Sequence, residues 1–174
     1  MDKKLRVLIS GTGFAGQGHA DAFRAVGTEV VGIVGRTPNV VKEVAKKMAI
    51  PYSGTDWQKA LIDCKPDIVS IATPGGAHYE TIKQAIEFGC NVFSDKPLTD
   101  AGESALELYE LAKEKNVKTA FASSFRYMPW VIHAKQLVAN GAIGEPVEAE
   151  FISHFNLERD IPFGWSHRKE DGGG

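Results

Sequence analysis

The sequence predicts an α/β fold, a doubly wound parallel sheet followed by the incomplete start of a second α/β domain. Three observations favour this fold. Strand-like and helix-like segments alternate over about the first 120 residues, a glycine-rich turn joins the first strand to the first helix, and the alternation then stops. We therefore divide the 174 residues into a first domain, 1–124, and the beginning of a second domain, 125–174.

The individual elements follow from apolar patterns and from residues that begin or end helices. The predicted strands are residues 5–10, 29–34, 67–71, 91–94 and 118–121. The predicted helices are residues 14–26, 38–48, 56–62, 77–88 and 101–115. Pro38 suits a first helical turn, Asp56 can cap a helix, and Gly27 and Gly89 suit helix ends. Right-handed crossovers between these strands predict a doubly wound sheet.

The chain after residue 124 has a different pattern. Residues 127–139 predict a helix that ends at Asn140 and Gly141, and residues 146–156 alternate like one long strand. An unpaired strand of that length would be an exposed edge that tends to associate. The final glycines, 172–174, supply no partner for it, so we expect the chain to stop inside its second domain.

The glycine-rich turn predicts a phosphate-binding site. It comprises Gly11, Thr12, Gly13, Phe14, Ala15 and Gly16. Gly11 allows the tight turn, Gly13 lets the backbone approach a phosphate, and Gly16 lets the helix pack close to the strand. The helix N-terminus adds free N–H groups and the positive end of the helix dipole. On spacing alone, the alternative is a structural turn that binds nothing.

Three further turns follow predicted strands and meet the glycine turn at the carboxyl edge of the sheet. They are Gly35-Arg36-Thr37, Thr73-Pro74-Gly75-Gly76 and Asp95-Lys96-Pro97. Open α/β sheets bind ligands at this edge. The convergence of the turns therefore favours a dinucleotide site over a set of ordinary loops.

The turn after the second strand bears on the choice between NAD and NADP. A site for NAD usually places Asp or Glu there to accept from the ribose 2′-hydroxyl. Arg36 and Thr37 can instead bind a 2′-phosphate, so the turn favours NADP(H). Alternatively, Arg36 stacks on the adenine or lies in solvent, and the protein uses either cofactor.

The other two turns carry candidates for the reacting end of the site. Thr73 and Pro74 precede a helix containing His78, and we expect this loop to lie against the nicotinamide half of the cofactor. The alternative is a turn threonine and a surface histidine. Lys96 is held in extended backbone by Pro97, and its ammonium group can donate a hydrogen bond to a substrate oxygen. A solvated surface lysine is the alternative.

Together these motifs resemble the glucose-fructose oxidoreductase, inositol dehydrogenase and rhizopine catabolism (Gfo/Idh/MocA) family. The matching motifs are Gly11-x-Gly13-x-x-Gly16-x-x-His19, Ala72-Thr73-Pro74 with His78, Asp95-Lys96-Pro97, Arg126 in Phe125-Arg126-Tyr127-Met128-Pro129, and Gly141-x-x-Gly144-x-Pro146. The resemblance implies a Rossmann domain, then an α/β domain with a large, mostly antiparallel sheet. It also implies hydride transfer between a nicotinamide cofactor and a sugar, cyclitol or related polyol.

The same resemblance implies roles for single residues. Lys96 would be the catalytic lysine, and Ala72, His78, Asp95 and Arg126 would join the turns in binding the cofactor. The full-length protein would be a homo-oligomer. Asp95 stands where the family has Glu before Lys-Pro, and the family's further Asp and His would follow Gly174. We therefore expect this chain to bind the cofactor but to be inactive alone.

Composition argues against several other classes of protein. With 43% hydrophobic and 24% charged residues and no apolar run near the ~20 residues of a membrane span, the chain has the composition of a soluble protein. No signal peptide is visible, so we expect a cytoplasmic protein. A net charge of −2 argues against nucleic-acid binding. Cys64 and Cys90 are expected to be buried in a reducing compartment, and no His or Cys spacing indicates a metal.

Two other functions remain open at this point. One is a non-catalytic NAD(P)-binding or regulatory module without a substrate domain. The other is a scaffold that binds no cofactor, which the four convergent turns disfavour.

Overall fold

The computed structural model of the chain describes residues 3–152 and 154. Its first compact unit, residues 3–122 of those described, contains a six-stranded sheet in which every pairing is parallel. The strands are β1 (Arg6–Ser10), β2 (Glu29–Val34), β3 (Tyr52–Gly54), β4 (Ile68–Ile71), β5 (Asn91–Ser94) and β6 (Thr119–Phe121). The helices of this unit are α1 (Phe14–Ala25), α2 (Pro38–Lys47), α3 (Trp57–Cys64), α4 (His78–Glu87) and α5 (Gly102–Glu114), with a 3-10 turn η1 (Gly75–Ala77) before α4.

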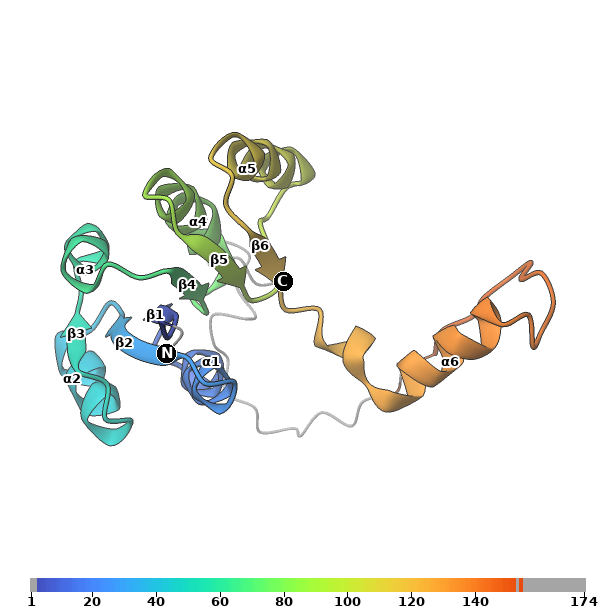
Figure 1. The fold of residues 1–174 in the computed structure, drawn as a ribbon, viewed down its shortest axis with the longest axis horizontal. Helices are drawn as coiled ribbons and strands as arrows, with labels where there is room; N and C mark the ends of the chain where they lie inside the picture. The colour runs from blue at the N-terminus through green and yellow to red at the C-terminus, as the bar shows by residue number, and fades with distance from the viewer. Residues whose placement is uncertain (1–2, 153, 155–174) are drawn as a thin grey trace. The chain divides into compact units, whose positions relative to one another are not determined.

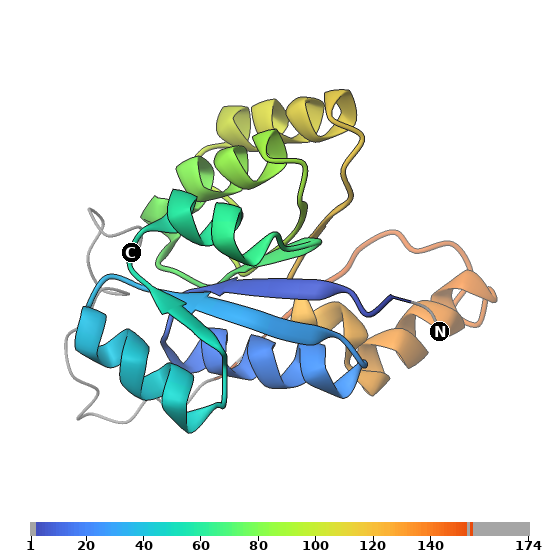
Figure 2. The ribbon, with the colours of Figure 1, turned by 60° about the vertical axis from the view of Figure 1, so that its left-hand side comes forward.

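The strand order confirms the doubly wound α/β fold. The order is β3-β2-β1-β4-β5-β6, so the chain moves outward from β1 in one direction and then from β4 in the other. Helices α1 and α2 cover one face of the sheet, and α3, α4 and α5 cover the other (Figures 1 and 2). The loops that follow β1 and β4 therefore leave the sheet beside each other, where the strand order reverses.

Two apolar cores hold these layers together. On β1, Val7 and Ile9 belong to the core under α1 and α2, whereas Leu8 belongs to the core under α3, α4 and α5. This alternation is the period of two that a strand buried on both faces requires. All three side chains are fully buried, so β1 is fixed in position from both sides.

The structure confirms the predicted cap at Asp56 and the predicted helix ends at Gly27 and Gly89. The Asp56 carboxylate accepts from the Lys59 backbone N–H at 2.9 Å, and Gly27 and Gly89 have φ values of 85° and 83°. Strand β3 was absent from the predictions. It contains three residues, two of which are Ser and Gly, and it exists because it pairs with the end of β2.

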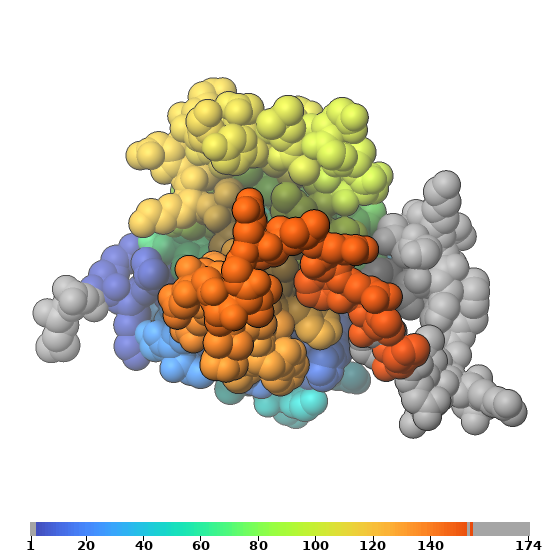
Figure 3. Space-filling view, turned by 90° about the vertical axis from the view of Figure 1, so that its right-hand side faces the viewer, coloured from blue at the N-terminus to red at the C-terminus, as the bar shows by residue number. Residues whose placement is uncertain are grey.

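The second unit, residues 123–152 of those described, is helical. It contains a 3-10 turn η2 (Ser124–Tyr127) and helix α6 (Pro129–Ala139), in which no residue is buried. Figure 3 shows α6 and the segment after it in orange. The unit begins after Ala122, two residues before the boundary expected from the sequence.

The predicted strand 146–156 is wrong over its described part. Residues 146–152 form no strand, and Val147 and Phe151 are 97% and 92% exposed. Alternating apolar residues form a stable strand only when a neighbouring strand pairs with their backbone. The described part of the second unit contains no such strand. Positions 153, 155 and 156 of that prediction lie outside the described residues.

Candidate functional site

Backbone hydrogen bonds bring the four predicted turns together at the carboxyl edge of the sheet. The first residue after a strand donates to the last carbonyl of the neighbouring strand in each case. These bonds are Gly11 N to Val34 O at 2.8 Å, Ala72 N to Ser10 O at 2.7 Å and Asp95 N to Ile71 O at 2.8 Å. The turns after β2, β1, β4 and β5 are thus linked in that order by the main chain.

The glycine turn is built around two close backbone approaches. Gly11 has a φ of 116°, and a Cβ on it would collide with the carbonyl oxygen of Ala72. A Cβ on Gly16 would collide with the carbonyl oxygen of Gly11. A Cβ on Gly13, in contrast, would meet no atom within 4 Å. Gly11 and Gly16 therefore form the turn, while Gly13 borders open space that a ligand can enter.

Helix α1 begins at this open space without a side-chain cap. Gly13 is the N-cap residue, the first turn has no acidic residue, and Phe14 is 96% exposed. The first intrahelical bond that reaches back to the cap runs from Gln17 N to Gly13 O at 3.1 Å, so the N–H groups before it lack carbonyl partners in the helix. These donors and the positive end of the helix dipole suit an anion such as a pyrophosphate.

Gln17 is a contributor that the sequence interpretation missed. Its Nε2 donates to the Thr12 carbonyl at 3.0 Å, and its Oε1 accepts from Lys47 Nζ at 3.1 Å. The side chain therefore fixes the backbone of the glycine turn from within α1. In the sequence, the only sign of this contact is a glutamine in the first turn of the helix that follows the glycine turn.

The turn after β2 lies directly beside the glycine turn. A Cβ on Gly35 would come within 2.9 Å of Thr12 Cγ2, so glycine is needed for this approach. Arg36 and Thr37 are exposed, and the Thr37 hydroxyl makes no cap bond to α2. Arg36 forms no ion pair within the described part of the chain. Both side chains are therefore available to a polar ligand.

Thr73 supplies an unsatisfied polar atom next to the glycine turn. Its Oγ1 is buried and has no hydrogen-bond partner among the described residues. A buried hydroxyl without a partner costs free energy, on the order of 1–3 kcal/mol, unless a ligand or water meets it. Pro74 and the buried Gly75 continue the loop into η1. Together with the space beside Gly13, this hydroxyl fits a dinucleotide lying along the edge of the sheet.

His78 is buried rather than exposed, which contradicts the surface-histidine alternative. Its relative exposure is 0%, and its ring nitrogens contact the carbonyl oxygens of Thr73 and Pro97, each at 2.7 Å. The side chain thus lies behind the two loops that it joins. The predicted contact of His78 with a cofactor stays a prediction.

Lys96 lies in the turn after β5 with its side chain exposed. The Asp95 carboxylate accepts from the Lys96 backbone N–H at 2.8 Å, and the Lys96–Pro97 bond is cis. Asp95 therefore shapes the turn, and the Lys96 ammonium group forms no ion pair within the described residues.

Arg126 lies in η2 of the second unit. Its guanidinium lies 5.8 Å from the Tyr127 ring centroid. Its predicted contact with the cofactor stays a prediction.

His19, which belonged to the glycine motif without an assigned role, is a structural contact between α1 and the sheet. Its Nδ1 lies 3.0 Å from the buried Ser70 Oγ, and its ring packs edge-on against Phe93 at 5.2 Å. Burial lowers the pKa of His19, and the charge of Asp95 opposes this shift to a smaller degree.

The described residues, 3–152 and 154, also bear on membrane spans and metal sites. No helix there combines the length and apolar content needed to cross a bilayer. No group of three His, Cys, Asp or Glu side chains there is arranged to hold a metal ion.

Several known proteins are similar to this chain in fold and in sequence. Levoglucosan dehydrogenase of Pseudarthrobacter phenanthrenivorans is 28% identical over 182 residues, which cover 98% of this chain and 47% of that protein. The crystal structure of an NAD binding oxidoreductase from Klebsiella pneumoniae matches with a TM-score of 0.81 and 28% identity, over 98% of this chain and 48% of that one. Scyllo-inositol dehydrogenase from Lactobacillus casei, solved with NAD(H) and scyllo-inositol, matches with a TM-score of 0.75 and 25% identity, over 82% and 43% of the two chains.

The chain spans about half the length of these relatives. The sequence profile of the oxidoreductase family with an NAD-binding Rossmann fold (GFO_IDH_MocA) matches residues 5–123. This range contains all six strands and the four turns at the carboxyl edge. The chain therefore belongs to the Gfo/Idh/MocA oxidoreductase family, and residues 5–123 are its NAD-binding Rossmann domain.

Proposed function

We propose that this chain is the cofactor-binding half of a dehydrogenase that transfers hydride to or from a sugar, cyclitol or related polyol. The observation that carries the proposal is the convergence of four turns that offer the open space beside Gly13, the uncapped N-terminus of α1, and the buried Thr73 hydroxyl, which has no partner among the described residues. The likeness to levoglucosan dehydrogenase and scyllo-inositol dehydrogenase supports the substrate class.

Each turn has a proposed partner on the cofactor. The glycine turn and the start of α1 would bind the pyrophosphate, Arg36 and Thr37 the adenosine ribose, and the loops of Thr73 and Asp95 the nicotinamide half. When bound, the nicotinamide supplies or accepts the hydride. Lys96 would donate a hydrogen bond or a proton to the substrate oxygen, because its ammonium group is free to move above the same edge.

Calorimetric titration of the chain with NADPH and NADH tests the binding proposal. We expect saturable heat with at least one cofactor and a matching rise in Tm. Absence of heat and of a thermal shift at millimolar concentrations of both cofactors would contradict the proposal.

The same titration tests the proposed preference for NADP(H). Arg36→Ala is expected to weaken NADPH binding by about tenfold or more and to leave NADH binding nearly unchanged, since only NADPH carries the 2′-phosphate. Arg24→Ala is the matched control, because Arg24 lies in the last turn of α1, at the other end of that helix. Equal losses for the two cofactors would remove Arg36 from the choice between them.

The role of Lys96 requires the full-length protein. Lys96→Met is expected to lower kcat by about 10²–10⁴-fold, the usual contribution of a general acid or base, with little change in NADH affinity. Lys115→Met, an exposed lysine at the end of α5, is the control. A variant that kept the wild-type kcat would exclude Lys96 from catalysis.

A non-catalytic NAD(P)-binding module is the second candidate function. One observation favours it: within the described residues, no carboxylate or imidazole is bonded to Lys96 to complete a catalytic group. Cofactor binding by the full-length protein, without hydride transfer to or from any polyol, would establish this second function.

For the dehydrogenase we propose that the full-length protein is a homo-oligomer and is cytoplasmic. Light scattering of the full-length protein tests the oligomeric state.

A further inference from the structure

The Gln17 side chain makes two hydrogen bonds that fix which way its amide faces. Its Nε2 donates to the Thr12 carbonyl at 3.0 Å, and its Oε1 accepts from Lys47 Nζ at 3.1 Å. A carbonyl oxygen only accepts and an ammonium group only donates, so the reversed amide would oppose two acceptors at one contact and two donors at the other. The amide therefore has one orientation, in which its nitrogen faces the glycine turn.

This contact determines the orientation of the peptide group between Thr12 and Gly13. Among residues 3–152 and 154, the only cis peptide bond precedes Pro97, so the Thr12–Gly13 peptide is trans. In a trans peptide the carbonyl oxygen and the N–H point in opposite directions. Because the Thr12 carbonyl faces Gln17, the Gly13 N–H faces away from that side chain.

The Gly13 N–H is one of the donors that the turn keeps available. No oxygen within the described part of the chain accepts a hydrogen bond from it. A Cβ on Gly13 would meet no atom within 4 Å, so a ligand has room to approach this peptide. A phosphate oxygen there would meet the N–H donor in the observed orientation, but a carbonyl oxygen if the peptide were reversed. The orientation of the peptide therefore decides whether a phosphate is attracted or repelled.

Backbone preference at residue 13 does not hold the peptide in this orientation. Gly13 has φ −71° and ψ −172°, and reversal of the preceding peptide moves its φ to a positive value. Glycine populates positive φ about as readily as negative φ, whereas other residues do so rarely. The glycine that admits a ligand thus leaves the peptide free to reverse, and the hydrogen bond from Gln17 supplies the missing restraint.

We propose that Gln17 is a positioning residue that holds the Thr12–Gly13 peptide with its N–H toward the cofactor phosphates. The inference rests on the proposed function, which assigns the pyrophosphate to this turn. Lys47, in the last turn of α2, supports the same arrangement by holding the other end of the amide. Because Thr12 also lies beside Gly35, the restraint acts where the turns after β1 and β2 touch.

The restraint can be measured in the wild-type chain by NMR. In the free chain we expect a scalar coupling across the hydrogen bond, between Gln17 Nε2 and the Thr12 carbonyl carbon. On addition of NADH, the Gly13 amide proton should move downfield, because it gains a hydrogen bond to a phosphate oxygen. A chain that binds NADH without this shift, or that lacks the coupling, would overturn the proposal.

Substitution tests the contribution of Gln17 to binding. Gln17→Met keeps the length of the side chain but removes both bonds, so it is expected to weaken NADH binding by about two- to tenfold, the factor that one hydrogen bond supplies. The shift of the Gly13 amide proton should shrink in parallel. Gln58→Met, at an exposed position in the first turn of α3, is the matched control. A folded Gln17→Met variant with the wild-type NADH affinity would contradict the positioning role.

Adenosine separates a restraint on the peptide from a general loss of structure, because it has no phosphate. Its affinity, followed by NMR titration, should be the same for the wild-type chain and for Gln17→Met. Equal losses of NADH and adenosine affinity would assign Gln17 a merely structural role and so refute the inference. Should Gln17→Met not fold, the response of the wild-type Gly13 amide proton to NADH remains the deciding measurement.

The two proposals fail in different ways. If the wild-type chain binds neither NADH nor NADPH, the proposed function fails and the inference falls with it. If NADH binds but the Gly13 amide proton does not shift, only the inference about Gln17 fails.

Discussion

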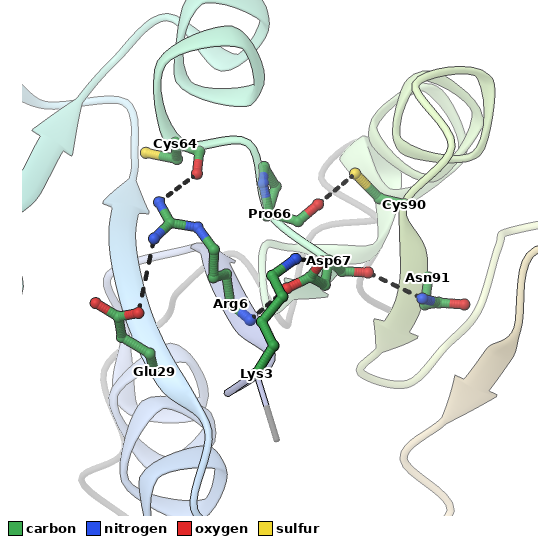
Figure 4. A network of polar contacts seen from close by, with 8 residues as sticks. All are labelled: Lys3, Arg6, Glu29, Cys64, Pro66, Asp67, Cys90 and Asn91. Atoms are coloured by element: carbon green, nitrogen blue, oxygen red, sulfur yellow. Dashed lines mark hydrogen bonds and ion pairs between the residues drawn. The ribbon is translucent and has the colours of Figure 1, made fainter. Parts of the chain in front are cut away.

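The two ends of the sheet use polar groups in opposite ways. At the amino end, side chains add hydrogen bonds to those of the main chain. The Asp67 carboxylate accepts from Lys3 Nζ at 2.9 Å and from the Arg6 backbone N–H at 2.8 Å, and the Arg6 guanidinium donates to the Cys64 carbonyl at 2.7 Å (Figure 4). Asn91 continues this network, because its Nδ2 donates to the Asp67 carbonyl at 3.0 Å. Side chains thus reinforce the backbone bonds that join the amino ends of β1, β4 and β5.

At the carboxyl end, main-chain bonds join the strands, and the buried His78 side chain contacts the loops after β4 and β5. Glycines allow the turns to touch, and the polar side chains of Arg36, Thr73 and Lys96 have no partner among the described residues. This difference predicts that the amino end contributes mainly to stability and the carboxyl end mainly to ligand binding. Substitutions at the amino end should alter the free energy of unfolding, and substitutions at the carboxyl end should alter ligand affinity.

The largest expected effect comes from the glycine turn. A single added methyl group there should change either the free energy of unfolding or the cofactor affinity, depending on which glycine receives it. Gly16→Ala should lower the free energy of unfolding by about 3 kcal/mol, because its Cβ meets the Gly11 backbone, which cannot move away. Gly13→Ala has open space around its Cβ, so it should change stability by less than about 0.5 kcal/mol yet weaken cofactor binding at least about tenfold. Urea unfolding and calorimetric titration with NADH and NADPH measure the two effects.

Gly18→Ala is the matched control for this pair. Gly18 lies in α1, and a Cβ there meets no atom within 4 Å. Alanine should raise the free energy of unfolding by up to about 1 kcal/mol, through helix propensity, without changing the affinity. Equal affinities for Gly13→Ala and Gly18→Ala would show that the space beside Gly13 does not receive the ligand.

A smaller effect is expected at the amino end. Asp67→Asn removes the ion pair with Lys3 and weakens the bond from the Arg6 N–H, so it should lower the free energy of unfolding by about 1–2 kcal/mol. The affinity for NADH should stay within about twofold. Asp63→Asn is the control, because the Asp63 pair with Lys59 is exposed and should contribute little to the free energy of unfolding.

The Asp67 contribution should also depend on pH. The hydrogen bonds from Lys3 and from the Arg6 backbone hold the pKa of Asp67 below its ordinary value, which is near 4. A carboxylate with a lowered pKa stabilises the fold above the unfolded-state value and loses that contribution as the pH falls through the folded-state value. The difference in unfolding free energy between wild type and Asp67→Asn should be constant from pH 7 to about 5 and shrink below about 4. A difference that already fell at pH 6 would contradict this assignment.

The last prediction concerns the two cysteines, which should not be alkylated in the folded chain. Burial raises the pKa of Cys90 to about 11 and also raises the pKa of Cys64. Because the thiolate is the reactive form, iodoacetamide at pH 8 should label neither cysteine in the folded chain and both in urea, as read by mass spectrometry. Rapid labelling of Cys90 in the folded chain would mean that the amino end opens, contrary to the comparison above.

The sequence predicted the parts of this molecule that local rules determine. Asp56 caps α3 and Gly27 ends α1 because their preferences act within one helical turn. The glycine turn was also recognisable, because a close backbone approach excludes every other residue type at Gly11 and Gly16.

The features that were missed depend on contacts between distant segments. Strand β3 owes its conformation to pairing with β2, and residues 146–152 lack the pairing that their alternating pattern would need. The burial of His78 was equally hidden, because it results from two loops that converge only in the folded sheet. A lone histidine in a first helical turn gives no local sign of either carbonyl.

The length of β1 has a practical consequence. This central strand has five residues, so roughly 16 Å separates the side-chain network from the glycine turn. Lys4 lies before the strand with an exposed side chain. A dye or a surface linker attached there would be anchored at the stable end, leaving the loops at the opposite edge facing the solution. Attachment at that position would therefore leave the carboxyl edge of the NAD-binding domain accessible from the solution.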